Sequence, residues 1–299
     1  MSDITLTASA RNSLLSLTGT ASLMSRTQGR LTTGLKVSSA IDDAVSYFKA
    51  KGLTDRATDF SVRKDEIDQG ISSLKAAING TDLVGSVLKQ MKGIVNSVRT
   101  ADSTTRAALS SQFNDLAKQI NTAVSDSSYQ GLNLVDNSSA SMTVYFNQVT
   151  SASLKVNAAN LRASYLLTTM SHGASAGSTV TDLVNMAGGG GAGFSALTSQ
   201  TSLSPASVLD HVATVIDRAT SRIRSQSALL AGNVTFLQSR MDFTSNYINT
   251  LTEGSGKLTL ADLNEEGANL VSLQTRQQIG VQSLSIAGQQ QQAILSLLR

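Results

Sequence analysis

The chain has 299 residues, of which 40% are hydrophobic, 15% charged and 4% aromatic, and its formal net charge is +3. A chain of this length can bury a sizeable core in one to three domains. It contains no Cys, which excludes a disulfide framework, cysteine-based metal sites and a thiol nucleophile. It contains 1 Pro. Average usage would give about 15, and so few helix breakers favour long uninterrupted helices.

The charge pattern argues against a nucleic-acid partner. The longest basic run is Arg63-Lys64, flanked by Asp65 and Glu66, whereas a phosphate-binding surface needs clustered Lys and Arg. The N-terminus has no basic segment followed by an apolar one, so we expect no cleaved Sec-type signal peptide. No stretch approaches the roughly 18 apolar residues of a membrane-spanning helix, so we expect no membrane insertion.

Residues 1–36 are predicted to form a helix with a narrow apolar stripe. The stripe follows the 3–4 alternation of a coiled coil. One heptad position holds Ala10, Leu17, Met24 and Leu31, and the other holds Leu14, Ala21, Gln28 and Leu35. The opposite face is Ser, Thr and Gln rather than Glu and Lys. A helix so narrowly apolar is marginal alone and needs a partner.

A second helical stretch is predicted at 42–100. Asp42 and Asp43 suit its first turn, where carboxylates meet the positive end of the helix dipole. Apolar side chains then continue at helical spacing from Val45 to Met91.

The chain then changes character. A further helix is predicted at 106–127, followed by short strands at 142–146 and 154–156. Residues 166–204 are rich in Ser, Thr and Gly and are predicted to form a small variable tip loop.

Two helices are predicted in the last third of the chain. The first begins at Ser204-Pro205, an N-cap followed by Pro, and is expected to end near residue 252 because Gly254 and Gly256 follow. The last helix, 261–298, again carries two heptad positions. One includes Leu263, Leu270, Leu284 and Leu298, and the other includes Leu273, Gly280, Ala287 and Ile294.

Both ends of the chain are therefore thin, weakly charged heptad helices around a loose middle. Each must pair with the other or with neighbouring copies of the chain. The predicted fold is mainly α, an elongated rod of long antiparallel coiled-coil helices with a small β-hairpin region and paired termini.

Three segments resemble motifs of bacterial flagellins. Residues 30–44 hold an Arg-Leu pair, two hydroxyl residues, Gly-Leu and an Asp-Asp-Ala helix start, and residues 129–135 hold an aromatic-x-Gly-x-Asn-Leu turn. Residues 261–299 match the family's C-terminal segment, in a style similar to alphaproteobacterial flagellins. The likeness covers about 1–165 and 205–299, which indicates a short form with a minimal central variable region.

This resemblance implies a structural subunit that polymerises into the helical flagellar filament for swimming motility. The alternative is a hook–filament junction protein. The implied inner coiled-coil domain comprises 1–41 and 257–299, and the outer helical core comprises 42–165 with the β-hairpin and 205–256. Residues expected to form the inner coiled coil and support polymerisation are Leu14, Leu17, Ala21, Met24, Leu31, Leu35, Leu263, Leu270, Leu273, Leu284, Ala287, Ile294 and Leu298. The family motif contributes Arg30, Gly34, Asp42 and Asp43.

The resemblance also implies partners and a location. The chain is expected to form a homopolymer, with other flagellins as further components, and to meet the flagellar export apparatus, a flagellin chaperone and the filament cap. Its expected location is the extracellular filament, reached by the flagellar type III route.

No enzyme, cofactor or metal site is expected. His172 and His211 do not stand in a metal-ligand spacing, and the glycine run at 188–193 follows no strand that would make it a nucleotide-binding loop. A coiled-coil adaptor or adhesin that does not polymerise remains the competing class.

Overall fold

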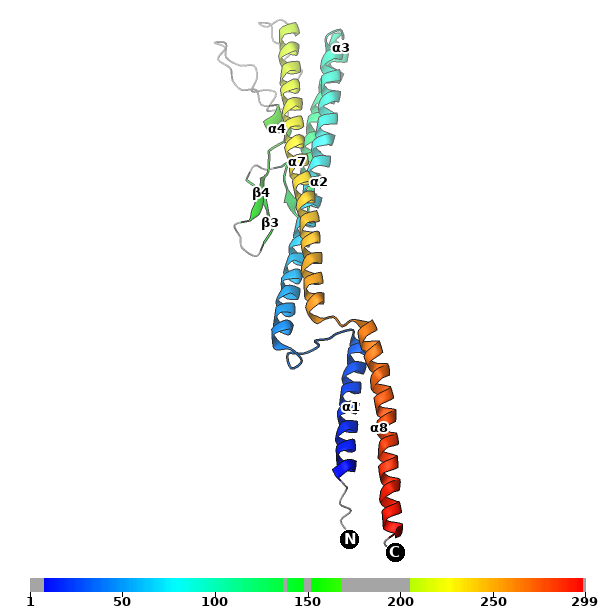
Figure 1. Cartoon of the computed structure of the whole chain (residues 1–299). Coiled ribbons are helices and arrows are strands. Elements are labelled where there is room, and N and C mark those ends of the chain that lie inside the picture. Colours follow the sequence, from blue (N-terminus) through cyan, green and yellow to red (C-terminus); the bar gives the residue numbers. More distant parts are fainter. Residues whose placement is uncertain (1–7, 137–138, 148–151, 168–204, 298–299) are drawn as a thin grey trace. The chain divides into compact units, whose positions relative to one another are not determined.

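A computed structural model describes residues 8–136, 139–147, 152–167 and 205–297. Long helices dominate it (Figure 1), so the predicted mainly α fold is confirmed. The chain divides into two compact units, 1–58 with 247–299 (unit 1) and 59–246 (unit 2). Both boundaries fall inside helices, α2 (Ala44–Val98) and α7 (Pro205–Thr259). The domain limits expected at 41/42 and 256/257 stay predictions.

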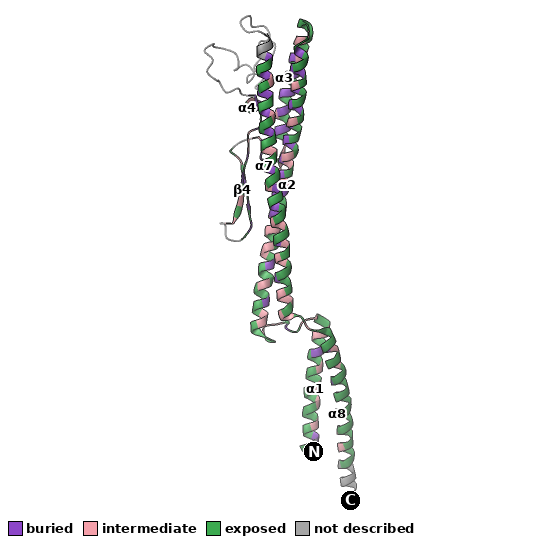
Figure 2. Cartoon of the chain, turned by 45° about the horizontal axis from the view of Figure 1, so that its top comes forward, coloured by how far each residue is buried: buried purple, intermediate pink, exposed green. Residues whose placement is uncertain are grey.

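Unit 2 contains the hydrophobic core. Within it α2, α3 (Ser103–Asp126) and α7 run together, and Figure 2 shows their buried residues facing one another. The α3 helix begins at its N-cap Asp102, whose carboxylate accepts a hydrogen bond from the Thr105 N–H at 3.2 Å. The largest fully buried side chains are Ile67, Leu74, Leu88, Met91, Phe113, Ile120, Leu134, Leu161, Leu167 and Ile216.

Ion pairs show that α2 and α7 are antiparallel in unit 2. Lys92 Nζ lies 2.5 Å from Asp217 Oδ1, and Arg99 pairs with Asp210, so contacts move back along α7 as they move forward along α2. The four side chains are all more than one third exposed. Each pair is therefore worth about 0–1 kcal/mol, and the core supplies most of the stability.

The segment at 128–136 explains the predicted turn motif. Strands β1 (Ser128–Tyr129) and β2 (Leu132–Asn133) are joined by Gln130 and Gly131, with φ angles of 50° and 81°. Positive φ at both central residues suits a type I′ hairpin turn. The Asn133 amide then donates to the Val124 carbonyl at 2.6 Å, while its Oδ1 accepts from Val135 N at 2.9 Å. Asn133 thus fastens the hairpin to the end of α3.

The second hairpin is confirmed where it was predicted. Strands β3 (Ser141–Tyr145) and β4 (Ser153–Asn157) pair antiparallel. The buried side chain of Val144 packs against α2 at Gly70, where an added Cβ would lie only 2.7 Å from Val144 Cγ2. The short helix α4 (Ala163–Leu166) follows. Residues 168–204, which make up nearly all of the predicted tip loop, are outside the part of the chain that the structure describes.

The prediction that Gly254 and Gly256 end the helix is wrong, because α7 continues through both to Thr259. A helical glycine costs about 1 kcal/mol relative to alanine. Packing within unit 1 offsets that cost. The Ser255 hydroxyl donates to the Ala50 carbonyl of α2 at 3.2 Å, and Leu53 lies against Gly254.

Substitution of alanine for two glycines of α2 should change the free energy of unfolding in opposite directions. A Cβ on Gly80 would lie 2.0 Å from Ser127 Oγ, the hydroxyl that bonds the Ala123 carbonyl at the end of α3. We expect Gly80→Ala to lower the free energy of unfolding by about 1–3 kcal/mol through overpacking. Gly93 has no heavy atom within 4 Å of its added Cβ. Gly93→Ala should therefore raise the free energy by about 0.5–1 kcal/mol. Denaturant unfolding followed by circular dichroism measures both, and equal effects would contradict the close packing.

Candidate assembly interface

Unit 1 brings the two terminal helices together. Helices α1 (Ala8–Thr33) and α8 (Leu263–Leu297) lie side by side (Figure 1). Two contacts fix their relative direction. Arg30 pairs with Glu266, and the Leu17 side chain lies against Gly280. Contacts near the end of α1 thus meet the start of α8, and the pairing is antiparallel.

On α8 the predicted heptad positions are the ones that face inward. Leu273 is buried, and Leu270, Gly280, Leu284 and Ala287 are half-buried. The buried Glu266 extends this strip by one heptad.

Three predicted residues of the last helix do not enter this description. Leu263 is 53% exposed and so does not face α1. The side chain of Ile294 and the whole of Leu298 lie outside the described residues.

On α1 only one of the two predicted positions faces inward. Leu17, Met24 and Leu31 are half-buried, but Leu14 is 45% exposed and Ala21 is also exposed. The second inward position is one residue earlier and holds hydroxyl residues, so Leu14 and Ala21 do not face α8 within the single chain, and their contribution to polymerisation stays a prediction. We call the inward strips the α1–α8 seam, which comprises Ala10, Ser13, Leu17, Thr20, Met24, Thr27, Arg30 and Leu31 with Glu266, Leu270, Leu273, Gly280, Leu284 and Ala287.

The sizes of the facing side chains give a physical reason why hydroxyl residues, rather than Leu14 and Ala21, face α8. The large side chains of α8 need small partners for the two backbones to approach closely, and Leu17 over Gly280 shows the same rule in reverse. Hydroxyl groups on α1 can bond their own helix, as Thr20 does by donating to the Ser16 carbonyl at 2.8 Å. They can therefore sit at a half-buried position without an unpaired donor.

One ion pair lies within the seam. Arg30 Nη1 donates to Glu266 Oε1 at 2.7 Å, and the two side chains are 29% and 9% exposed. Arg30 belongs to the predicted family motif. The role of Glu266 was missed, although its position one heptad before Leu273 was a usable signal.

A short joint follows α1 within unit 1. Gly34 has a φ of +71°, a conformation that favours glycine. Its carbonyl accepts a hydrogen bond from Ala261 N at 3.0 Å, while Lys36 N donates to the Thr259 carbonyl at 2.7 Å. Between these bonds, Leu35 forms an isolated antiparallel bridge with Leu260. The family-motif glycine thus lets the chain turn out of α1 and pair with the segment that precedes α8.

Asp42 and Asp43 accept hydrogen bonds from different segments. Asp43 was expected in the first turn of the helix, but α2 begins after it, and Asp43 instead caps α2, since its Oδ1 accepts from Val45 N at 3.0 Å. Asp42 instead holds the preceding loop, because its Oδ2 accepts from the N–H and hydroxyl groups of both Ser38 and Ser39. These bonds, led by that of the Ser38 hydroxyl, hold the pKa of Asp42 below its ordinary 3.8. The Ser46 hydroxyl likewise lowers the pKa of Asp43.

Unit 1 leaves much apolar surface uncovered. The cluster that forms the hydrophobic core lies entirely in unit 2, at residues 67–237. In unit 1 only six described apolar side chains are buried, namely Ala10, Val37, Ala50, Ala57, Leu251 and Leu273. Twelve large ones are exposed, namely Leu14, Leu15, Leu23, Ile41, Val45, Phe48, Leu260, Leu263, Val271, Ile279, Val281 and Ile286.

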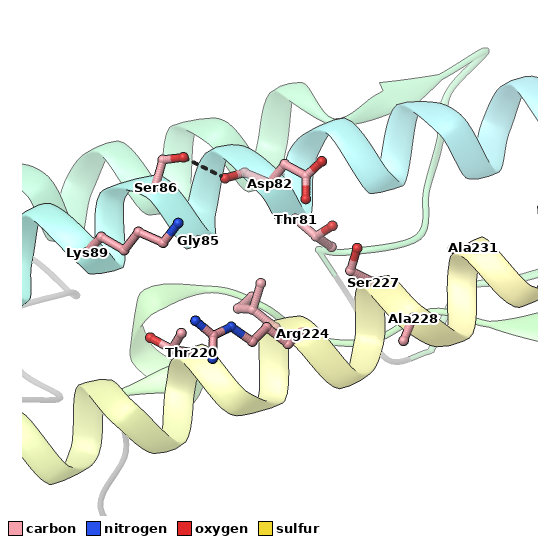
Figure 3. A pocket seen from close by; sticks show the side chains of 11 residues that line it. Thr81, Asp82, Gly85, Ser86, Lys89, Thr220, Arg224, Ser227, Ala228 and Ala231 are labelled. Atoms are coloured by element: carbon pink, nitrogen blue, oxygen red, sulfur yellow. Dashed lines mark hydrogen bonds between the residues drawn. The ribbon is translucent and has the colours of Figure 1, made fainter.

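A groove of about 360 Å³ lies between α2 and α7 in unit 2 (Figure 3). Lys89 and Arg224 contribute cations from facing helices, and Asp82 contributes a carboxylate. The Ser86 hydroxyl donates to the Asp82 backbone carbonyl at 3.0 Å and is engaged within its own helix. The lining residues include no histidine that could activate a hydroxyl.

Among the described residues, no group of three or more His, Asp or Glu residues could hold a metal ion. No helix in the described ranges is long and apolar enough to cross a membrane.

Comparison with protein families identifies the chain. The model of the bacterial flagellin N-terminal helical region matches residues 4–140, and that of the C-terminal helical region matches residues 213–298. The chain belongs to the bacterial flagellin family. The two matched regions contain the whole of α1 and the whole of α8, so the family signal includes the seam.

Full-length relatives agree with this family. Flagellin FljK of Caulobacter vibrioides is 29% identical over 301 residues, covering 100% of this chain and 99% of the relative. A flagellin of Brucella melitensis is 27% identical over 299 residues, covering 100% of both chains. Among solved structures, a Bacillus cereus flagellin aligns with a TM-score of 0.45 and 11% identity, covering 60% of this chain and 88% of that one. The family models and the full-length relatives together show that the present chain is a structural subunit of the flagellar filament.

The Asp42 carboxylate gives a pH-dependent prediction. Because its pKa is lowered in the folded chain, the loop that it holds contributes stability above pH 3.8, and this contribution is lost as the pH falls through the lowered pKa. A carbon-13 NMR titration should give Asp42 a pKa below 3.8. The Ser38→Ala, Ser39→Ala double variant removes both hydroxyl donors and should raise that pKa. An Asp42 titration that is the same in both chains would contradict the hydrogen-bonded loop.

Proposed function

We propose that this flagellin polymerises into the filament through the faces of α1 and α8 that remain exposed in the single chain. The observation that carries the proposal is the contrast between the two units. Among the described residues, unit 2 gathers its buried apolar side chains in one large core and leaves seven large ones exposed, whereas unit 1 buries only six apolar side chains and leaves twelve large ones exposed. Exposed large apolar side chains that gather on one part of a protein mark sites of association.

The distribution of these residues around α8 favours several neighbours. The seam occupies one face of α8, while Val271 and Ile279, 62% and 61% exposed, lie outside it together with Val281 and Ile286. A helix that is apolar on all sides is stable when it is surrounded. A single partner covers one face only, so we infer that other copies of the chain cover the rest. Contacts between different faces of identical chains generate open helical polymers.

On α1 the exposed residues include two that the sequence assigned to the coiled coil. Leu14 and Ala21 face away from α8. In this proposal they contact neighbouring copies, as does the exposed Leu263 of α8. The predicted polymerisation residues thus divide into a seam within one chain and contacts between chains.

Two alternatives make different predictions. The relatives are named flagellin, and no observation favours the hook–filament junction protein. A coiled-coil adaptor would remain soluble on concentration with its exposed faces uncovered. Sedimentation of the concentrated chain after addition of short filament seeds separates polymer from adaptor.

The family places the subunit in the extracellular filament. We propose further that the chain is exported by the flagellar route without a cleaved signal peptide, and that it meets an export chaperone and the filament cap. The absence of Cys supports this route, since an unfolded chain would pass without disulfide links. A secreted chain whose N-terminal sequence begins at Met1 or Ser2 is the expected result, and an N-terminus cleaved within the first helix would overturn the proposed route.

Exposed apolar residues of α8 should control assembly. Burying an Ile or Val side chain contributes about 1.5–3 kcal/mol, so Val271→Ser and Ile279→Ser should each raise the critical concentration roughly ten- to a hundredfold. Both side chains are exposed in the single chain, so its helix content should not change. Gln278→Ser, at an exposed polar position of the same helix, is the matched control. Seeded polymerisation followed by sedimentation gives the critical concentration.

Two results would contradict the proposal. One is normal assembly of the Val271→Ser, Ile279→Ser double variant. The other is an equal defect in Gln278→Ser, because that defect would come from disturbing the helix rather than from lost apolar contacts.

A further inference from the structure

We propose that the Arg30–Glu266 ion pair sets the register in which α1 and α8 pair. Its atoms are 2.7 Å apart, and the Glu266 side chain is only 9% exposed. The other ion pairs described in unit 1, Lys51–Asp55 and Glu253–Lys257, each join residues of one helix and are more than half exposed. Among the described residues, this pair alone links the two terminal helices through charge.

The apolar part of the seam does not define one register strongly. In the observed pairing Leu17 lies over Gly280. A slip of one heptad would place Met24 over Gly280 and Leu31 opposite Leu273, so large side chains would again meet small or apolar ones. Coiled coils with such regular seams depend on polar residues to exclude shifted pairings.

The ion pair penalises slips in both directions. In the slip just described, Arg30 comes beside Leu273 and loses its carboxylate. In the opposite slip, Glu266 comes beside Leu23 and loses its guanidinium. Removing one partner from a largely buried pair leaves an uncompensated charge, which costs far more than the intact pair contributes. The backbone bonds of the joint, from Ala261 N to the Gly34 carbonyl and from Lys36 N and Val37 N to the Thr259 carbonyl, would also break in either slip. Of these residues only Val37 is buried, so most of the freed groups can bond water instead.

The helix ends reinforce the pairing direction. Arg30 is in the last turn of α1, and Glu266 is in the first turn of α8. A cation near a C-terminus and an anion near an N-terminus are both favoured by the helix dipoles. The two charges meet only when the helices are antiparallel and in the observed register.

The cysteine-free chain allows a direct test with engineered cysteine pairs. Leu17→Cys with Gly280→Cys reports the observed register, and Met24→Cys with Gly280→Cys reports the slipped one. The full-length chain is oxidised before and after seeded assembly, and the intramolecular product is separated by its gel mobility. We expect the observed-register product to dominate. Glu266→Gln should lower the ratio of the two products on the order of tenfold.

Matched variants separate this role from a general loss of charge. Glu66→Gln breaks the Arg63–Glu66 pair, which has a 2.6 Å separation but lies within α2, and it should leave the ratio unchanged. Exchanging the charges by Arg30→Glu with Glu266→Arg should restore the observed-register product. That restoration should be incomplete, because each exchanged charge opposes its helix dipole.

Each outcome of the cross-linking experiment supports or overturns the proposed role of the ion pair. An unchanged ratio in Glu266→Gln would overturn the proposal. If Glu266→Gln removes both products, the exchanged pair decides, because restored cross-linking supports the proposal and continued loss overturns it. The inference concerns pairing within one chain and does not require polymerisation. Chains that keep the observed-register product but never assemble would overturn the proposed function alone.

Discussion

Most of the buried apolar surface of this flagellin lies in the core of unit 2, whereas unit 1 buries few apolar side chains, and the behaviour of the chain depends on that difference. In unit 2, α2, α3 and α7 enclose a continuous apolar core that includes Phe113 and Ile216. In unit 1 the terminal helices share only a narrow seam. Burial of apolar surface is the main favourable term in both folding and association. Burial of the apolar surface that unit 1 leaves exposed therefore contributes favourable free energy to assembly.

Polar contacts in unit 1 supply geometry where apolar burial is scarce. The Arg30–Glu266 pair, the Gly34 joint and the Asp42 loop each fix a position or a direction with a few hydrogen bonds. Such contacts add little net stability, because they replace bonds to water. They limit the ways in which the segments can pair, and a polymer of identical subunits needs the same surface on every copy. Specificity and stability thus come from different residues in this unit.

Close packing governs unit 2 instead. Gly70 lets Val144 of the β3–β4 hairpin approach α2, and Gly80 makes room for Ser127 at the end of α3. Asn133 replaces missing backbone partners at the same end of α3. These positions have little freedom, since native interiors leave few gaps and an added methyl group is felt.

The sequence by itself determined the long helices apart from the end of α7, the strands β3 and β4, the heptad strip of α8 and the presence of carboxylates at the start of α2, because each follows from local periodicity or from charges near a helix terminus. The signature at 30–44 and 261–299 likewise pointed to the family. Tertiary structure decided which neighbouring residue of α1 faces inward, that Asp42 holds a loop rather than a helix, and that α7 passes through Gly254 and Gly256. Residues 13 and 14 are both compatible with a helical stripe, and the size of the partner's side chains selects between them. Glu266 acquires its role only when a residue distant in the chain brings a guanidinium within 2.7 Å.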